Sequence, residues 1–93
     1  MTDEELQLTR DFILRAAARF PNTGATRTIL KISLESIGMD HLSEKGPDSL
    51  DAQIEYLISA EFLVRREKAH TASYEFFKIT PKGDDYLRKS KLL

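Results

Sequence analysis

The chain has 93 residues, 41% hydrophobic and 31% charged, which predicts one small globular domain over residues 1–93. It has no cysteine, so a disulfide framework, a cysteine-based zinc site and a thiol nucleophile are all excluded. The formal net charge of −1 gives the chain as a whole no electrostatic attraction to nucleic acid.

The sequence shows no segment suited to a membrane. No apolar run approaches the ~20 residues that span a bilayer, and the acidic start Met1–Glu5 is unlike a signal peptide. Together with the lack of cysteine, this leads us to expect a cytoplasmic protein without a membrane partner.

A first helix is expected from Asp3 to Phe20. Acidic residues suit its first turn, because the N-terminus of a helix carries partial positive charge. Five apolar residues share one face: Leu6, Ile13, Ala16, Ala17 and Phe20, with Phe12 and Leu14 flanking them. The solvent side is marked by Arg10, Arg15 and Arg19. The turn Pro21–Gly24 ends this element.

A second helix is expected from about Ala25 to Ile37, and it would bury Leu30, Leu34 and Ile37. Gly38 is the natural left-handed residue just past its end. A tight connection between two helices has about three or four residues. Residues 38–47 are longer than that, which predicts an expanded turn with a short helical segment around Asp40–Ser43.

A third helix follows. Its apolar residues recur at i, i+4, i+7 and i+8, which places them on one face: Leu50, Ile54, Leu57 and Ile58. Asp48 or Ser49 is the expected N-cap of this helix.

A hairpin and a last helix complete the chain. Phe62–Val64 predicts a strand, and Arg65–Ser73 predicts a charged turn. Tyr74–Thr80 predicts a returning strand with Phe77 and Ile79 on one face. Thr80 is a good N-cap for a helix over Pro81–Lys89, since proline at the first helical position loses only an unpaired N–H.

This order of elements resembles the second half of a winged helix-turn-helix domain. The run Ala60–Val64 stands where that superfamily usually has Gly-Leu-Val, and Ile79–Gly83 is similar to its common ending. The resemblance covers most of the chain. It implies a mainly α fold with a small β-hairpin (α+β): a three-helix core, a two-stranded wing and a C-terminal helix. The superfamily includes stand-alone regulators of about this length, among them small winged-helix proteins of Mu-like prophages with a similar element order.

The resemblance implies a transcriptional regulator that binds double-stranded DNA, with the third helix in the major groove. The outward face of that helix opposes this function, because it carries carboxylates and neither lysine nor arginine. The expected face comprises Asp48, Ser49, Ala52, Glu55, Tyr56 and Ser59, with Asp51 and Gln53 at its edges. Ser49 and Gln53 are its candidates for reading base edges.

Basic residues cluster at the hairpin instead. Further basic residues lie on the second helix and in the connection that precedes the third helix. Together with those of the hairpin they form a candidate stripe for phosphate contacts: Arg65, Arg66, Lys68, His70, Arg27, Lys31 and Lys45. The alternative is that these charges are only the solvated tip of a hairpin.

Two aromatic residues on expected outward surfaces indicate a partner protein. Tyr56 lies outward on the third helix, and Phe76 faces away from Phe77 on the second strand. We expect a homodimer, since a pair of wings and helices can span two half-sites. For Phe76, the alternative is that the strand phase slips by one residue and the ring packs under the first helix or a terminus. The second functional hypothesis is a winged helix that contacts a protein partner through its acidic third helix.

Catalysis has little support in the sequence. Asp40, His41 and Ser43 hold the residue types of a triad, but neighbours on one loop rarely attain triad geometry. His41 and His70 lie in different loops and do not supply the four ligands of a structural zinc site. The glycines are scattered, and each has a turn or cap explanation. We therefore expect no enzyme activity, no metal and no cofactor.

Overall fold

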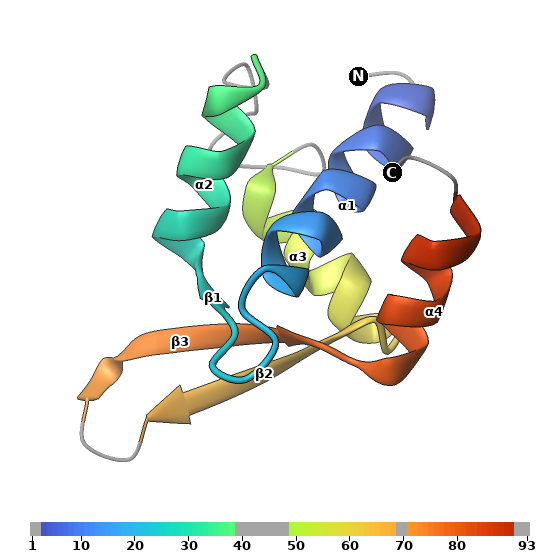
Figure 1. Ribbon diagram of the computed structural model, residues 1–93. Coiled ribbons are helices and arrows are strands. Elements are labelled where there is room, and N and C mark those ends of the chain that lie inside the picture. Colours follow the sequence, from blue (N-terminus) through green and yellow to red (C-terminus); the bar gives the residue numbers. More distant parts are fainter. Residues whose placement is uncertain (1–2, 39–48, 69–70, 91–93) are drawn as a thin grey trace.

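The computed structural model describes residues 3–38, 49–68 and 71–90 (Figure 1). Within these ranges, four helices and a three-stranded antiparallel sheet form a small compact α+β domain. The elements are α1 (Asp3–Ala18), β1 (Ala25–Thr26), α2 (Arg27–Ser36), α3 (Leu50–Ser59), β2 (Leu63–Lys68), β3 (Thr71–Ile79) and α4 (Pro81–Ser90). The strand order is β1-β3-β2. The predicted hairpin is thus confirmed and is extended by a third, short strand.

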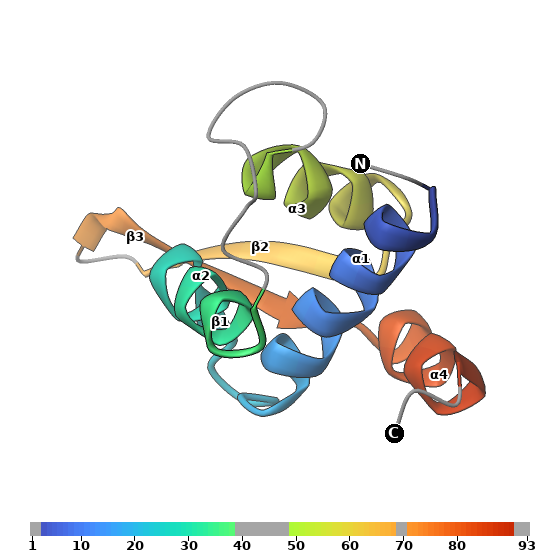
Figure 2. The same ribbon diagram turned by 90° about the horizontal axis from the view of Figure 1, so that it is seen from above.

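α1 is the central element of the domain, since it contacts α2, α3, α4 and β3. Figures 1 and 2 show the helices gathered over one end of the hairpin, with the opposite ends of β2 and β3 extending beyond them. Leu14, expected at the edge of the apolar face, is completely buried. Phe20 is 38% exposed, because α1 ends at Ala18 and does not carry this ring into the core. In the described part of the chain, no helix has the length and apolar character needed to cross a membrane.

The second helix begins two residues later than expected, because Ala25 and Thr26 form β1. These residues pair with Phe77 and Phe76 of β3. The Thr26 hydroxyl then accepts a hydrogen bond from the Ile29 N–H (3.2 Å), so the last residue of the strand is also the N-cap of α2.

The far end of α2 differs from the prediction at one residue. Leu30 and Leu34 are buried as expected, but Ile37 is the C-cap and is 47% exposed. Gly38 has φ +85°, which confirms the left-handed residue after the helix. The predicted helical turn around Asp40–Ser43 lies outside the described residues.

α3 has the predicted start and the predicted buried face. The Ser49 hydroxyl accepts a hydrogen bond from the Ala52 N–H (3.1 Å) and caps the helix. Leu50, Ile54 and Leu57 are buried, whereas Ile58 is half-buried at the edge of the core.

The hairpin strands are longer than expected. Arg65 and Arg66, expected in the charged turn, lie in β2 opposite Phe77 and Phe76. Backbone pairing continues through these polar residues, since a ladder needs no apolar alternation at its solvent-facing end. Phe77 is buried as expected, and Phe76 is half-buried beside β1.

α4 begins as the sequence predicts. The Thr80 hydroxyl accepts a hydrogen bond from the Gly83 N–H (3.0 Å), which confirms the N-cap. Leu87 packs into the core, and Tyr86 is half-buried against it. The two terminal leucines lie outside the described residues.

Candidate nucleic-acid interface

The exposed surface of α3 is smaller than its sequence suggests. Asp51, Glu55, Tyr56 and Ser59 are exposed, as expected. Ser49 and Gln53, the two candidates for reading bases, are only 4% and 1% exposed.

Their burial has a structural cause. The Ser49 hydroxyl is used as the helix cap, and Gln53 turns toward α1, where its Oε1 accepts a hydrogen bond from Arg10 Nε (2.9 Å). In this structure neither side chain is placed to contact a base edge.

Both carboxylates on the exposed face of α3 have an arginine partner from a neighbouring element. Arg27 Nε, at the start of α2, lies 2.6 Å from Asp51 Oδ1. Arg65, on β2, contacts Glu55, and its Nε also lies 3.4 Å from Glu75 Oε2 on β3. We call the Arg27–Asp51 and Arg65–Glu55 contacts the α3 ion pairs. The acidic character inferred from α3 alone is therefore neutralised by residues distant in sequence.

The α3 ion pairs are surface contacts. The four side chains are between 38% and 58% exposed. Pairs this exposed each contribute about 0–1 kcal/mol, because water screens the attraction and two long side chains lose freedom. A competing anion in solution can therefore displace either carboxylate at small cost.

The structure places two residues of the predicted basic stripe, Arg27 and Arg65, beside the same face of α3. Arg65 and Arg66 are exposed on β2, and Arg27 and Lys31 are exposed one turn apart on α2. Lys68 ends β2, and only its backbone is described. Lys45 and His70 lie outside the described residues.

Two residues of this surface were missed by sequence reasoning. Glu75 lies diagonally across the hairpin from Arg65, a neighbour relation that appears only once the strand register is known. Arg10 was assigned to solvent, but its guanidinium carbon lies 3.6 Å from the centre of the Tyr56 ring. Arg10 of α1 thus packs against the ring of Tyr56, the exposed tyrosine of α3.

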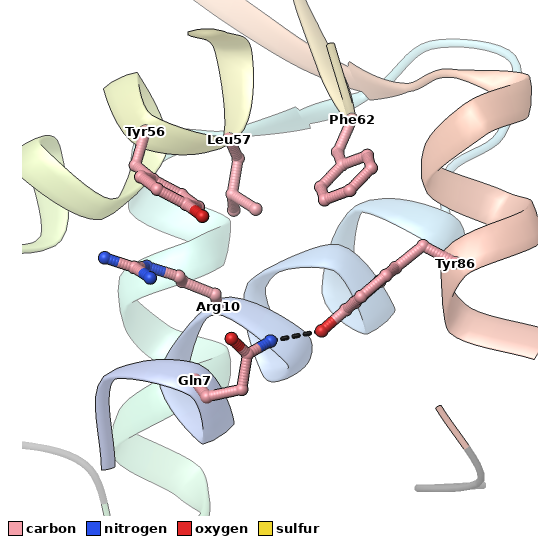
Figure 3. A pocket seen from close by; sticks show the side chains of 6 residues that line it. All are labelled: Gln7, Arg10, Tyr56, Leu57, Phe62 and Tyr86. Atoms are coloured by element: carbon pink, nitrogen blue, oxygen red, sulfur yellow. Dashed lines mark hydrogen bonds between the residues drawn. The ribbon is translucent and has the colours of Figure 1, made fainter. Parts of the chain in front are cut away.

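A hollow of about 190 Å³ opens beside this contact (Figure 3). Side chains from α1, α3, the α3–β2 turn and α4 surround it: Gln7, Arg10, Tyr56, Leu57, Phe62 and Tyr86. We call it the aromatic hollow. The rings of Phe62 and Tyr86 stack at a centroid distance of 4.8 Å, and the Gln7 amide donates to the Tyr86 hydroxyl.

Tyr86, which lines the hollow, should ionise at a higher pH than an ordinary tyrosine. Its burial raises its pKa from an ordinary 10.0 to about 12, and a hydrogen bond with the Asp11 carboxylate adds to the effect. The neutral phenol is therefore favoured in the folded state. Its contribution to stability is complete below about pH 10 and is lost as the pH rises toward about 12.

An ultraviolet titration of the three tyrosines should show one of them ionising near pH 12, and Tyr86→Phe should remove that step. A late step that persists in the variant would assign the raised pKa to a different tyrosine.

Within residues 3–38, 49–68 and 71–90, no group of three or more histidine, aspartate or glutamate side chains is placed to hold a metal ion. Comparison of the chain with protein-family models, curated proteins and solved structures gave no significant match. The function is therefore argued from the geometry of the α3 surface and the hairpin.

Proposed function

We propose that the domain is a winged helix-turn-helix protein that binds double-stranded DNA as a transcriptional regulator in the cytoplasm. In this proposal α2 and α3 form the helix-turn-helix, and β2 and β3 form the wing. The order of helices and strands agrees with the resemblance noted in the sequence. Because a fold alone does not define a function, the proposal depends on the surface of α3 and its neighbours.

The observation that carries the proposal is the pair of arginines beside the exposed face of α3. Arg27 and Arg65 engage carboxylates four residues apart on α3, which corresponds to about 6 Å along the helix. Guanidinium groups bind phosphate oxygens with two parallel hydrogen bonds, as they bind carboxylates. A phosphate backbone can therefore replace Asp51 and Glu55 as the partner of these arginines.

Arg66 adds a cation at the hairpin, where it projects from the face of the sheet opposite Arg65, since successive side chains of a strand alternate. It is exposed on β2 next to Arg65 and has no carboxylate partner among the described residues. Phosphate contacts of this kind give affinity without sequence specificity. Ser49 and Gln53 are buried, so other side chains of α3 would have to contact the bases. The exposed candidates are Ser59, Tyr56, and Asp51 and Glu55 once phosphate has replaced them in the α3 ion pairs.

The test is binding to a random-sequence duplex across a salt series. Arg65→Ala with Arg66→Ala should weaken binding and make the log–log salt slope shallower by about 2, one unit for each lost phosphate contact. Asp51→Asn with Glu55→Gln should strengthen binding by about threefold to tenfold, because Arg27 and Arg65 each lose a carboxylate of α3 that competes with phosphate, while Arg65 keeps Glu75.

Lys82→Ala with Lys89→Ala is the matched control, since it removes two cations from exposed ion pairs of α4 that lie outside the proposed DNA and dimer surfaces. An equal loss of affinity in this control would show that only total charge matters. If the wild-type protein does not bind duplex DNA at low salt, the proposal fails.

We propose that the protein acts as a homodimer, paired through the outward face of α1. That face carries an acidic end, an apolar centre and a basic end, spaced as one helical stripe: Glu4, Leu8, Phe12, Arg15 and Arg19. Leu8 is 36% exposed, and Phe12 is only half-buried. An antiparallel pairing about a two-fold axis between Leu8 and Phe12 places each apolar residue against the other type and opposite charges at both ends.

A groove beside the basic end fits this arrangement. It measures about 320 Å³ and is lined by Arg15, Ala18, Arg19, Asp84, Leu87 and Arg88. The acidic first turn of a second α1 carries the charge that this groove would accept. Sedimentation of the samples used for DNA binding checks the dimer, and a monomer at every concentration would contradict it.

A second candidate function is contact with a protein partner through α3. It is favoured by Tyr56, a large side chain that is 47% exposed and follows Glu55 on α3. The salt series separates the two functions, because failure to bind DNA together with an intact fold leaves this surface for a protein.

A further inference from the structure

The hairpin has one face turned toward the helices and one turned away from them. Figure 1 shows α1, α2 and α3 on the same side of β2 and β3. Arg65 and Phe77 point to that side, since Arg65 contacts Glu55 of α3 and Phe77 is 3% exposed. Because successive side chains of a strand alternate, the neighbouring residues Arg66 and Phe76 project from the opposite side.

Four side chains of known placement lie together on that opposite side, which we call the outer sheet face. Across the hairpin, Val64 pairs with Lys78, and Arg66 pairs with Phe76. Side chains directly opposite each other have Cβ atoms about 4.5–5.5 Å apart, and diagonal neighbours are within reach of long side chains. The four side chains therefore form one patch, with the apolar pair on one diagonal and the two cations on the other.

The two cations of this patch favour an anionic partner. Arg66 is exposed and Lys78 is half-buried, and neither has a carboxylate partner among the described residues. Glu75, the acid next to Phe76 in sequence, lies toward Arg65 on the helical side of the sheet. A positive surface without acids attracts anions and repels a second copy of itself.

The apolar pair distinguishes between kinds of anion. Val64 is 42% exposed, and Phe76 is half-buried, so part of its ring is accessible. Single-stranded nucleic acids bind by stacking their bases on aromatic side chains while neighbouring cations contact the phosphates. The bases of a duplex are stacked on each other, and the carboxylates of an acidic peptide have no use for an aromatic ring. The combination thus favours a single strand.

We propose that the outer sheet face binds single-stranded DNA. One base stacks on Phe76, and Arg66 and Lys78 contact phosphates beside that nucleotide. Val64 packs against the same base, where it suits the C5-methyl group of thymine, which the uracil of RNA lacks. This face lies on the other side of the sheet from the α3 ion pairs, so the inference does not depend on duplex binding.

The probe is a fluorescently labelled oligothymidylate of about twelve nucleotides, a length within the range of single-strand sites in small domains. It should bind the wild-type protein in the micromolar range at low salt, measured by fluorescence anisotropy, and should shift the ring resonances of Phe76. An abasic strand and a glutamate peptide of the same charge should each bind about fivefold or more weakly, because they lack a base to stack. An oligouridylate of the same length should bind no more tightly than the oligothymidylate.

Arg66→Ala should weaken binding of the oligothymidylate and make its log–log salt slope shallower by about 0.7, the value for one phosphate contact on a single strand. Arg65→Ala is the matched control, because it removes the same charge from the adjacent position on the other side of the sheet. It should change the affinity by less than about twofold. Phe76→Leu, checked for folding by circular dichroism, should weaken binding of the oligothymidylate and leave the abasic strand unaffected.

Several results would overturn the proposal. They are no binding of the oligothymidylate at low salt, equal affinity for the abasic strand, or equal losses in the two arginine variants. Equal or tighter binding of the glutamate peptide would assign the face to an acidic protein, and tighter binding of the oligouridylate would assign it to RNA. The comparison with the abasic strand uses the wild-type protein, so it holds even where Phe76→Leu does not fold. Duplex binding is measured separately, so either proposal can fail without the other.

Discussion

Ile54→Ala should destabilise the domain by about 2–5 kcal/mol, the largest effect we expect from a single side chain. Ile54 is 2% exposed and belongs to the buried face of α3. Truncation removes three carbons from the core and leaves a cavity, because the closely packed neighbours relax only partly. Urea unfolding followed by circular dichroism measures the free energy of unfolding.

Ile32→Ala is the matched control for this prediction. Ile32 is 59% exposed on α2, so the same truncation there should change stability by less than about 0.5 kcal/mol. A loss below about 1 kcal/mol at Ile54 would mean that α3 presents a different face to the core, and the α3 surface described above would then be wrong.

Gly83→Ala should cost about 1–3 kcal/mol or more, although it adds only one methyl group in a helix. A Cβ at Gly83 would overlap the Phe62 carbonyl oxygen and lie 2.9 Å from Ile79 Cγ1. The Phe62 oxygen accepts a hydrogen bond from the Thr80 N–H (3.0 Å), so it cannot move away without losing this contact. Alanine is otherwise favoured over glycine in helices, so the sign of the change distinguishes the two effects.

Gly38→Ala provides the comparison. Gly38 has φ +85° and open space around it, so alanine there should cost only the left-handed backbone conformation, about 1–2 kcal/mol. If Gly83→Ala is neutral or stabilising in urea unfolding, then α4 does not approach the α3–β2 turn as closely as the structure places it.

The features predicted correctly from the sequence depend on residues close together in the chain. The buried face of α3 follows from the spacing of Leu50, Ile54 and Leu57, and the start of α4 follows from Thr80 and Pro81. Each of these signals is complete within about two helical turns, so the rest of the fold is not needed to interpret it.

The features that were missed depend on contacts between distant residues. β1 has only two residues, and they form a strand because β3 lies beside them. The sequence suggests that Gln53 is exposed. In the fold its side chain turns inward and accepts a hydrogen bond from Arg10, which is 43 positions away in the chain. Glu61 has φ +67° at a place where glycine would be the usual residue, and nothing local in the sequence marks it.

The same limit applied to the candidate site. The basic residues of the hairpin were found from the sequence, but their placement was wrong for Arg65 and Arg66, which lie in β2 and not in the turn. The α3 ion pairs were not predicted, because they join residues 24 and 10 positions apart and require the packing of α2 and β2 beside α3. The aromatic hollow was missed for the same reason, since its walls come from both ends of the chain.

Thr26 joins the sheet to α2 without a hinge. Its backbone belongs to β1, its side chain caps α2, and the next residue, Arg27, holds Asp51 at the start of α3. No intervening residue is available to absorb a rotation between these elements. We therefore expect the hairpin and α2 to move as one body. α3 is joined to that body by contacts from both of its parts, Arg27 of α2 and Arg65 of β2.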